Sequence, residues 1–101
     1  MGADAGTRAA ETPRLLFFFE GTDGYARRVD GFLAQVLQRR RNHHTFQIHR
    51  INVQANPELA QRFRIDSTPS ICIVEGRRVV LRAHRPRGAN ELQRALAPWL
   101  R

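Results

Sequence analysis

The feature that most constrains this fold is a pair of short apolar segments separated by one stretch of helical periodicity. Residues 15–19 are an unbroken apolar run, and residues 45–53 form a second strand-like segment. Between them the apolar residues recur at steps of three and four: Val29, Phe32, Leu33, Val36 and Leu37. Two strands joined by a helical crossover lie parallel, with a right-handed connection. This part of the chain therefore predicts a β-α-β unit.

The second half of the sequence predicts a short helix, a hairpin and a final helix. Asn56 and Pro57 have the residue types of a helix start, because Asn is a favoured N-cap and Pro is favoured at the first helical position. Apolar segments at 70–74 and 79–81 predict an antiparallel hairpin, and Asn90 is the expected cap of the last helix. The order βαβαββα predicts an α/β fold with a four-stranded mixed sheet and helices on both faces.

Length and composition limit the class of protein. The 101 residues predict one domain at residues 14–101, preceded by a flexible tail at residues 1–13. The hydrophobic content of 42% is too high for a disordered chain, and no apolar run approaches the roughly 20 residues of a membrane span. The first 14 residues lack the apolar core of a signal peptide, and a single cysteine agrees with a reducing compartment. We expect a cytoplasmic protein.

The charge is strongly positive and comes from arginine alone. The net charge is +8 at pH 7, and all 17 basic residues other than histidine are Arg. Biased codon usage explains this composition, and so does selection for phosphate or carboxylate contacts, because guanidinium binds both groups through paired hydrogen bonds. Both explanations stay open. In either case a chain this basic attracts polyanions at moderate salt.

Three segments resemble the thioredoxin superfamily, together spanning about residues 15–97. Residues 15–36 have the order of its first matching strand, active-site turn and helix. Residues 51–63, INVQANPELAQRF, resemble the family stretch NVDENPELAQRY. Residues 65–70, IDSTPS, resemble the family stretch IRSTPT, whose proline is cis. The resemblance implies a thioredoxin-like fold, and the lack of a CxxC motif also resembles the KaiB-like and sensor-kinase branch, whose members act by binding partners.

The resemblance also implies a geometry around Pro69. An X-Pro bond is cis in only about 5–6% of folded cases, so a cis Thr68–Pro69 bond is expected from the family and not from the residues alone. In the family, the backbone of the residue at the position of Thr68 pairs with an extended substrate beside the turn that corresponds to residues 21–26.

The match breaks at the redox site itself. Where thioredoxin has Trp-Cys-Gly-Pro-Cys-Lys, residues 22–27 read TDGYAR. Asp23 replaces the nucleophilic cysteine, Ala26 replaces the resolving cysteine, and Phe17 falls where thioredoxin has a buried acid. Dithiol–disulfide exchange needs two thiols, and this chain has one cysteine. We expect no dithiol oxidoreductase activity and no catalytic residues.

The remaining residues of interest have simpler interpretations. Asp23 is most simply a helix cap. Cys72 lies in the apolar segment 70–74, where a free cysteine is most simply a small buried hydrophobic residue. A single-cysteine redox role would need an exposed thiol near positive charge, and it is kept as an alternative. The four His have no metal-ligand spacing, so we expect no metal and no cofactor.

A preserved scaffold without its dithiol predicts a non-catalytic protein-binding or regulatory module. The predicted partner surface is Thr22, Asp23, Gly24, Tyr25, Ala26, Thr68 and Pro69. A second function stays open, a nucleic-acid or ribonucleoprotein accessory, because the fold should bring one set of basic residues to the opposite pole: Arg39, Arg40 and Arg41 in the last turn of the first helix, with His43, His44, Arg77 and Arg78. A merely solvated helix end is the alternative there.

The start of the chain predicts an open sheet edge. Thioredoxin has a strand and a helix before the segment that matches Leu15, and 14 residues are too few for both. The segment 45–53 is therefore predicted at an edge, where it is either guarded by Gln47 and His49 or available for a partner or a homo-oligomer by strand addition.

Overall fold

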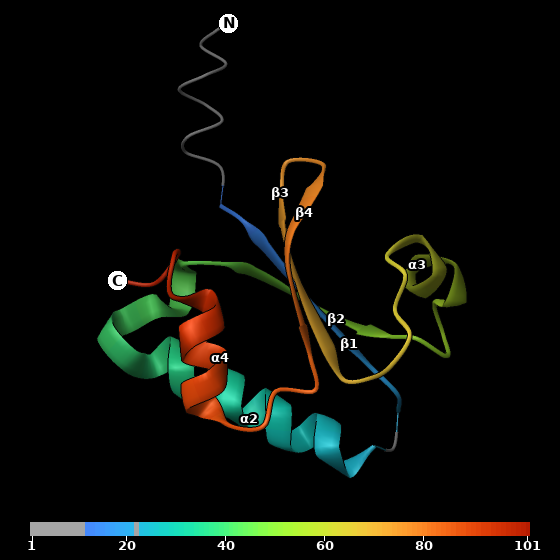
Figure 1. Ribbon diagram of the computed structural model, residues 1–101, viewed down its shortest axis with the longest axis horizontal. Helices are drawn as coiled ribbons and strands as arrows, with labels where there is room; N and C mark the ends of the chain where they lie inside the picture. The colour runs from blue at the N-terminus through green and yellow to red at the C-terminus, as the bar shows by residue number, and fades with distance from the viewer. Residues whose placement is uncertain (1–11, 22) are drawn as a thin grey trace, which may run out of the picture.

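The structure is a computed structural model, in which residues 12–21 and 23–101 are described. Its order of strands and helices confirms the prediction, with one added turn of 3-10 helix (Figure 1). The elements are β1 (Arg14–Phe19), α2 (Gly24–Gln38), η1 (Arg39–His44), β2 (Gln47–Asn52), α3 (Pro57–Arg62), β3 (Ser70–Glu75), β4 (Arg78–His84) and α4 (Ala89–Leu96).

The sheet has the strand order β2-β1-β3-β4. β1 pairs with β2 in parallel, as the helical crossover requires, and with β3 antiparallel. β3 and β4 form the antiparallel hairpin, with a shift of register between Ile73 and Val74. β2 therefore lies at an edge of the sheet as predicted, and β4 lies at the other edge.

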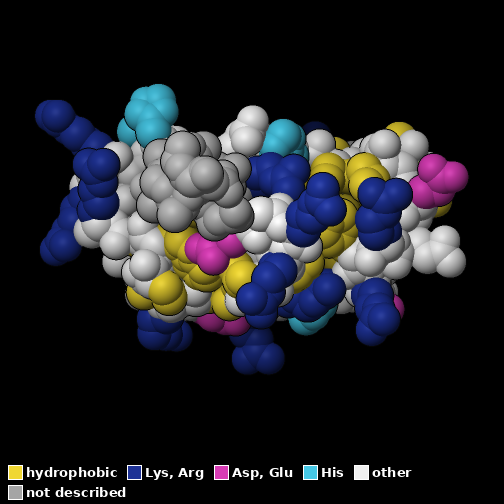
Figure 2. Space-filling view, turned by 90° about the horizontal axis from the view of Figure 1, so that it is seen from above, with side chains coloured by type: hydrophobic (Ala, Val, Ile, Leu, Met, Phe, Trp, Pro, Cys, Tyr) yellow, Lys and Arg dark blue, Asp and Glu magenta, His cyan; other side chains and the backbone are white. Residues whose placement is uncertain are grey.

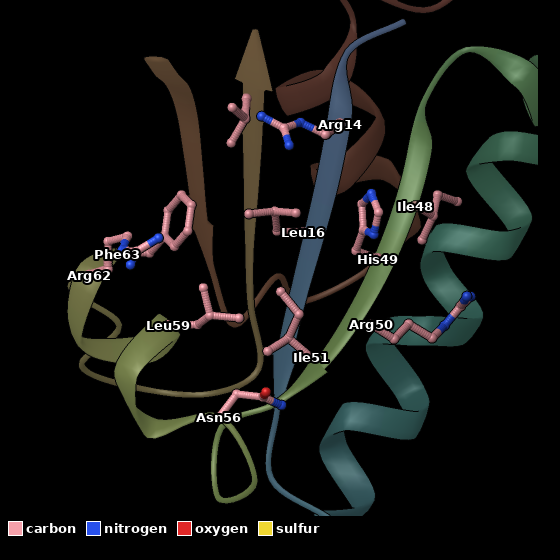
Figure 3. Close-up of a pocket in the computed structure, with 11 residues that line it drawn as sticks. Arg14, Leu16, Ile48, His49, Arg50, Ile51, Asn56, Leu59, Arg62 and Phe63 are labelled. Atoms are coloured by element: carbon pink, nitrogen blue, oxygen red, sulfur yellow. The ribbon is translucent and has the colours of Figure 1, made fainter. Parts of the chain in front are cut away.

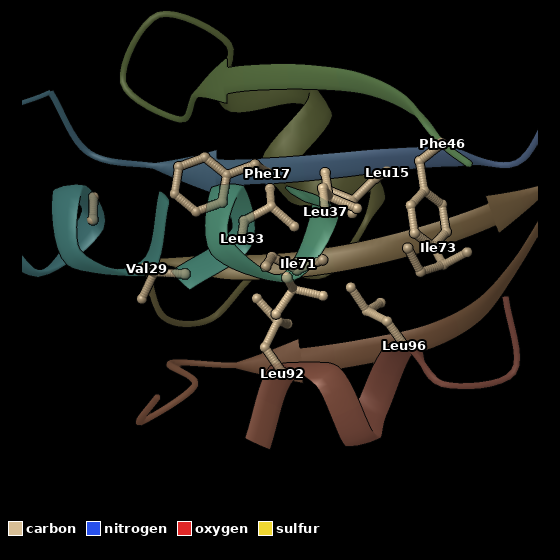
Figure 4. Close-up of a cluster of buried hydrophobic side chains, with 12 residues drawn as sticks. Leu15, Phe17, Val29, Leu33, Leu37, Phe46, Ile71, Ile73, Leu92 and Leu96 are labelled. Carbon is tan, nitrogen blue, oxygen red and sulfur yellow. The ribbon is translucent and has the colours of Figure 1, made fainter. Parts of the chain in front are cut away.

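One face of the sheet is covered by α2 and α4, and the buried side chains there form the larger core (Figures 1 and 4). Alternate residues of β1 and β3 point into it, because successive side chains of a strand point to opposite faces. The helical residues that fill it recur at the predicted steps of three and four. Its principal members are Leu15, Phe17, Val29, Leu33, Val36, Leu37, Phe46, Ile71, Ile73, Leu92 and Leu96.

The other face carries a smaller core under α3. Leu16, Phe18, Cys72 and Val74 are its buried residues. Half-buried side chains from β2, β4, α3 and the segments next to β2 and α3 complete it: Ile51, Val53, Leu59, Phe63, Ile65 and Val79. The five-residue apolar run is thus shared between two cores, which is why it shows no alternation in the sequence.

The end of the first helix differs from the prediction. Arg39, Arg40 and Arg41 do not form the last turn of α2, which ends at Gln38; they open η1, where Arg40 and Arg41 have φ of 53° and 58°. The physical reason is Asn42, which is only 1% exposed. Its Nδ2 donates to the Arg39 carbonyl at 2.7 Å, and an Asn side chain that bonds nearby backbone competes with helix propagation.

One predicted cap is wrong, and another is the N-cap residue but makes no side-chain capping bond. The last helix has Gly88 as its N-cap residue, not Asn90, and Glu91 accepts a hydrogen bond from the Arg87 N–H at 3.0 Å instead. Asn56 is the N-cap residue of α3 as predicted, but its side chain makes no capping bond; its Nδ2 donates to the Asn52 carbonyl at 3.0 Å.

Residues 1–11 of the predicted tail lie outside the described residues. At the end of that predicted tail, the Pro13 carbonyl accepts a hydrogen bond from the Gln47 N–H at 2.9 Å, so Pro13 is joined to β2.

None of the helices within residues 12–21 and 23–101 is long and apolar enough to cross a membrane.

Candidate functional site

The start of α2 is fixed by Asp23. This residue has extended backbone angles, and its carboxylate accepts a hydrogen bond from the Tyr25 N–H at 2.9 Å. The Asp23 carbonyl accepts from the Ala26 N–H at 3.1 Å. These are the contacts of an N-cap, so the predicted capping role of Asp23 is confirmed. Ala26 is 6% exposed and packs in the larger core, while Gly24 is exposed.

The segment before β3 has the geometry that the resemblance implied. The Thr68–Pro69 peptide bond is cis, and Pro69 is buried. The Thr68 hydroxyl donates to a carboxylate oxygen of Glu20 at 3.3 Å, which ties this segment to the end of β1. The Ser70 hydroxyl donates to the Ser67 carbonyl at 2.6 Å, which closes the turn around the proline.

Arg85 joins the two parts of the predicted site. Its backbone N–H donates to the Pro69 carbonyl at 2.9 Å, and its guanidinium donates to the Thr68 carbonyl. The same guanidinium lies 4.7 Å from the centroid of the Tyr25 ring, within the range of a cation–π contact. The Tyr25 hydroxyl donates to the Pro86 carbonyl at 2.6 Å. Tyr25, Thr68 and Pro69 are therefore brought together, through residues that the sequence analysis did not select.

The Arg85 contact changes what the site offers. The resemblance assigned the backbone of Thr68 to an extended substrate, but the Thr68 carbonyl already has a donor within the chain. A polar hollow of about 730 Å³ opens beside it, lined by Tyr25, His84, Arg85, Arg87 and Glu91. Two guanidinium groups face one carboxylate there, and that carboxylate is bonded to the Arg87 N–H. The hollow therefore favours an anionic group over a cationic one.

The single thiol lies elsewhere. Cys72 is 1% exposed in the middle of β3, among the residues of the smaller core. Burial raises the pKa of the Cys72 thiol, and the nearby positive charge of Arg82 opposes this shift. Phe17 is buried in the larger core and supplies no acid. Asp23 and Ala26 stand where the resemblance places the two cysteines of thioredoxin, and one chain has no pair of thiols for dithiol exchange.

The arginines of the predicted basic cluster differ in exposure. Arg40, Arg41, Arg77 and Arg78 are exposed, whereas Arg39 is half-buried and donates to Gln93. The last residues of the chain link the two regions: the Trp99 indole donates to Glu75 at 2.7 Å, and the Arg101 N–H donates to Asn42 at 3.0 Å. The end of α2 and the 75–78 turn thus share one end of the molecule, with residues 99–101 between them.

One residue of the predicted partner surface cannot be placed, and the predicted lack of metal ligands concerns the whole described chain. Thr22 lies outside the described residues. In the part of the chain that the structure describes, no three His, Cys, Asp or Glu side chains are grouped so that they could hold a metal ion.

These features define a thioredoxin-like α/β domain whose site has a cis-proline but no dithiol. Comparison with solved structures supports this class. The fold is similar to that of thioredoxin-2, a component of the malaria parasite protein secretion machinery, with a TM-score of 0.74, 16% identity, and coverage of 86% of this chain and 82% of that one. It is also similar to Deadhead, the germline-specific thioredoxin of Drosophila melanogaster, with a TM-score of 0.73, 17% identity, and coverage of 97% and 90%.

A bacterial structure gives the same result. Trxlp from Edwardsiella tarda matches with a TM-score of 0.74 and 14% identity, over 98% of this chain and 92% of that one. No family model matches the sequence, and no curated protein matches it. At these identities the similarity establishes the fold, and the thioredoxin-like fold predicted from the sequence motifs is confirmed.

Proposed function

We propose that this protein is a non-catalytic binding or regulatory module that recognises a protein partner at the ancestral thioredoxin site. The binding surface consists of the turn at the start of α2, the Thr68–Pro69 segment and Arg85. The observation that carries the proposal is the Arg85 guanidinium, which bonds the Thr68 carbonyl and lies against the Tyr25 ring. A site that has lost its thiols is here held in shape by contacts that involve no sulfur.

The same contacts suggest which partner segment fits. A carboxylate of the partner can bind the Arg85 guanidinium in place of the Thr68 carbonyl, because a charge-assisted hydrogen bond is stronger than one to a neutral carbonyl. The Thr68 carbonyl is then released to accept a backbone N–H of the partner, as in β-strand addition. Arg87 is exposed in the same hollow and offers a second cationic contact. We therefore favour an extended partner segment with an acidic residue.

The test is a quantitative capture of partners from extracts of the source organism. Wild-type protein is compared with Tyr25→Ala and Arg85→Ala, and Arg94→Ala serves as a control because Arg94 is an exposed residue of α4. A partner retained by wild-type and Arg94→Ala, but lost from both site variants, supports the proposal. Equal capture by all four proteins contradicts it. A Cys72→Ala variant separates the single-cysteine redox alternative, since our proposal requires capture to be unchanged.

A second candidate function rests on the exposed arginines at the opposite end. Arg40, Arg41, Arg77 and Arg78 have no acidic partner within the described chain, and guanidinium groups contact phosphates without reading sequence. A salt titration of a fluorescent single-stranded RNA tests it. Binding that survives charge reversal of all four would remove this candidate.

The location of the protein is part of the same proposal. We place it in the cytoplasm, a reducing compartment where its single cysteine has no oxidising partner.

A further inference from the structure

A groove of about 700 Å³ lies on the sheet face opposite α2 and α4, and it shares no lining residue with the hollow beside Arg85 (Figure 3). Leu16 and Ile51 of the sheet point into it. Val74 of β3 also lines it. Leu59 and Phe63, from α3 and its end, form one wall. The floor and this wall are therefore mainly apolar, although His49 of β2 and Asn56 also line the groove.

The groove exists because this face of the sheet is only partly covered. Parallel strands such as β1 and β2 are normally covered by helices on both faces. On one face α2 has 15 residues and α4 has 8, whereas among the described residues α3, with 6, is the only helix on the other. α3 packs at the far end of β1, where the rings of Phe18 and Phe63 lie 5.6 Å apart.

The open end of the groove is at the start of β1. A second hollow, of about 340 Å³, is lined by Arg14 and Val74 as well, and it continues past them to Thr12, Gln47 and Gly76. The two hollows share these two residues and so form one continuous surface along β1. This surface runs along β1 beside α3. In a layered α/β fold, a second helix would pack on the sheet in this position and along this direction.

The edges of the groove are basic. Arg14 and Arg62 lie on either side of the apolar floor, and no Asp or Glu lines it. Arg82 adjoins it, because the strand register places Arg82, Cys72 and Leu16 in one row across the sheet. Figure 2, a view onto the top of the molecule, shows apolar side chains flanked by dark blue ones toward the right, the side on which Figure 1 places α3. Arg50 is excluded, since it points toward α2 and pairs with Asp30 at 2.9 Å.

We propose that this groove binds an amphipathic helix of a partner protein whose apolar stripe is flanked by Asp or Glu. The apolar floor receives the stripe, with anchors at steps of three and four, as in other helix-in-groove complexes. The flanking carboxylates meet Arg14 and Arg62, so the two surfaces are complementary in charge. This surface is separate from the one under our proposed function, and each can fail without the other.

Two other occupants fit less well. Residues 1–11, MGADAGTRAAE, contain no large apolar side chain apart from Met1, so they cannot fill an apolar floor. A second copy of the chain brings another net charge of +8 and the same arginines to the interface, and like charges facing each other oppose association.

The test uses a designed peptide of roughly 18 residues, long enough to form a helix, with Leu at steps of three and four and Glu on both flanks. A matched peptide has Lys in place of Glu. Binding is followed by fluorescence anisotropy of the labelled peptides. We expect the Glu peptide to bind, the Lys peptide not to bind, and the affinity for the Glu peptide to fall between about 0.05 and 0.3 M NaCl.

Matched charge reversals locate the binding surface. We expect the double variant Arg14→Glu/Arg62→Glu, and Arg62→Glu alone, to weaken binding by about tenfold or more. The control Arg27→Glu/Arg94→Glu changes the net charge by the same amount as the double variant on exposed residues of α2 and α4, and should change affinity less than about twofold. Circular dichroism and urea unfolding check that each variant is folded.

Several outcomes would overturn the proposal. Equal binding of the Lys peptide, or equal losses in the groove and control variants, would show a nonspecific effect of charge. A dimer in sedimentation that dissociates on Arg62→Glu, without peptide binding, would assign the groove to a second copy. Altered hydrogen exchange of residues 1–11 in that variant, again without peptide binding, would assign it to the chain's own start. Tyr25→Ala should leave peptide affinity unchanged.

Discussion

The two faces of the sheet are used differently. The face under α2 and α4 has a cluster of 12 buried hydrophobic residues, and the helices close over it. The face under α3 has 4 buried residues, ringed by half-buried ones, and it stays open along β1. The first face supplies most of the burial that stabilises the fold. The second keeps an open groove, so the two sides of the same four strands differ in how completely helices cover them.

The largest expected effect breaks the closed face. Leu92 is 0% exposed and contacts the larger core from α4, whereas Leu59 on α3 is only half-buried. We expect Leu92→Ala to lower the free energy of unfolding by about 3 kcal/mol, and Leu59→Ala by about 1 kcal/mol, because the lost burial and the cavity are larger in the closed core. Urea unfolding of the two variants measures the difference. Equal losses would mean that the two faces contribute alike.

The next effect concerns the junction at the end of the closed layer. Asn42 Oδ1 accepts from the Thr45 hydroxyl at 2.7 Å and from the Arg101 N–H at 3.0 Å, while its amide holds the Arg39 carbonyl. Asn42→Ala should lower the free energy of unfolding by about 2 kcal/mol, since it removes a buried side chain and leaves three partly buried groups without their partner. Thermal unfolding checks this against Asn90→Ala, an exposed control. A loss no greater than that of the control would contradict the role given to Asn42.

The part of the fold that the sequence predicts is the part governed by local pattern. The steps of three and four from Val29 to Leu37 predict α2, and the apolar context of Cys72 predicts its burial. The cis bond before Pro69 follows from the family motif, since its residues alone favour trans. Each of these depends on a short window of residues.

The missed features depend on contacts between distant residues. Arg85 reaches Thr68 because the register of β3 and β4 pairs Ser70 with His84, which places Arg85 beside Pro69. No periodicity indicates that register, although an Arg-Pro pair directly after a strand is a signal that could have been followed. The groove was missed for another reason, because it is defined by what does not cover the sheet.

A smaller effect tests the thiol of Cys72, which is buried on the α3 face. Burial holds the pKa of Cys72 above its value in the unfolded chain, so the neutral thiol stabilises the fold at all pH values below the unfolded pKa of about 8.5. That contribution is lost as the pH rises through the folded pKa, by at most about 1.4 kcal/mol per pH unit. Urea unfolding of wild-type and Cys72→Ala from neutral to alkaline pH isolates it, because only the wild-type carries the thiol.

Alkylation of Cys72 gives a second reading of the same prediction. The thiol should react in the native protein about a hundredfold or more slowly than in the unfolded chain, because reaction requires local opening. Rapid alkylation of the native protein at neutral pH would mean that the α3 face opens to its floor, and the single-cysteine redox alternative would then replace the binding proposal.

The smallest expected effect lies where the closed face meets the edge strand. The Arg50 guanidinium of β2 pairs with the Asp30 carboxylate of α2 at 2.9 Å, and the two side chains are 50% and 37% exposed. Pairs this exposed contribute about 0.2–1 kcal/mol, and salt screens them. A double-mutant cycle with Asp30→Asn and Arg50→Gln should give a coupling energy near the lower limit that falls further in about 0.5 M NaCl. A larger coupling that resists salt would mean that this pair anchors the edge strand to α2, and the stability of the closed face would then extend to β2 beyond its apolar core.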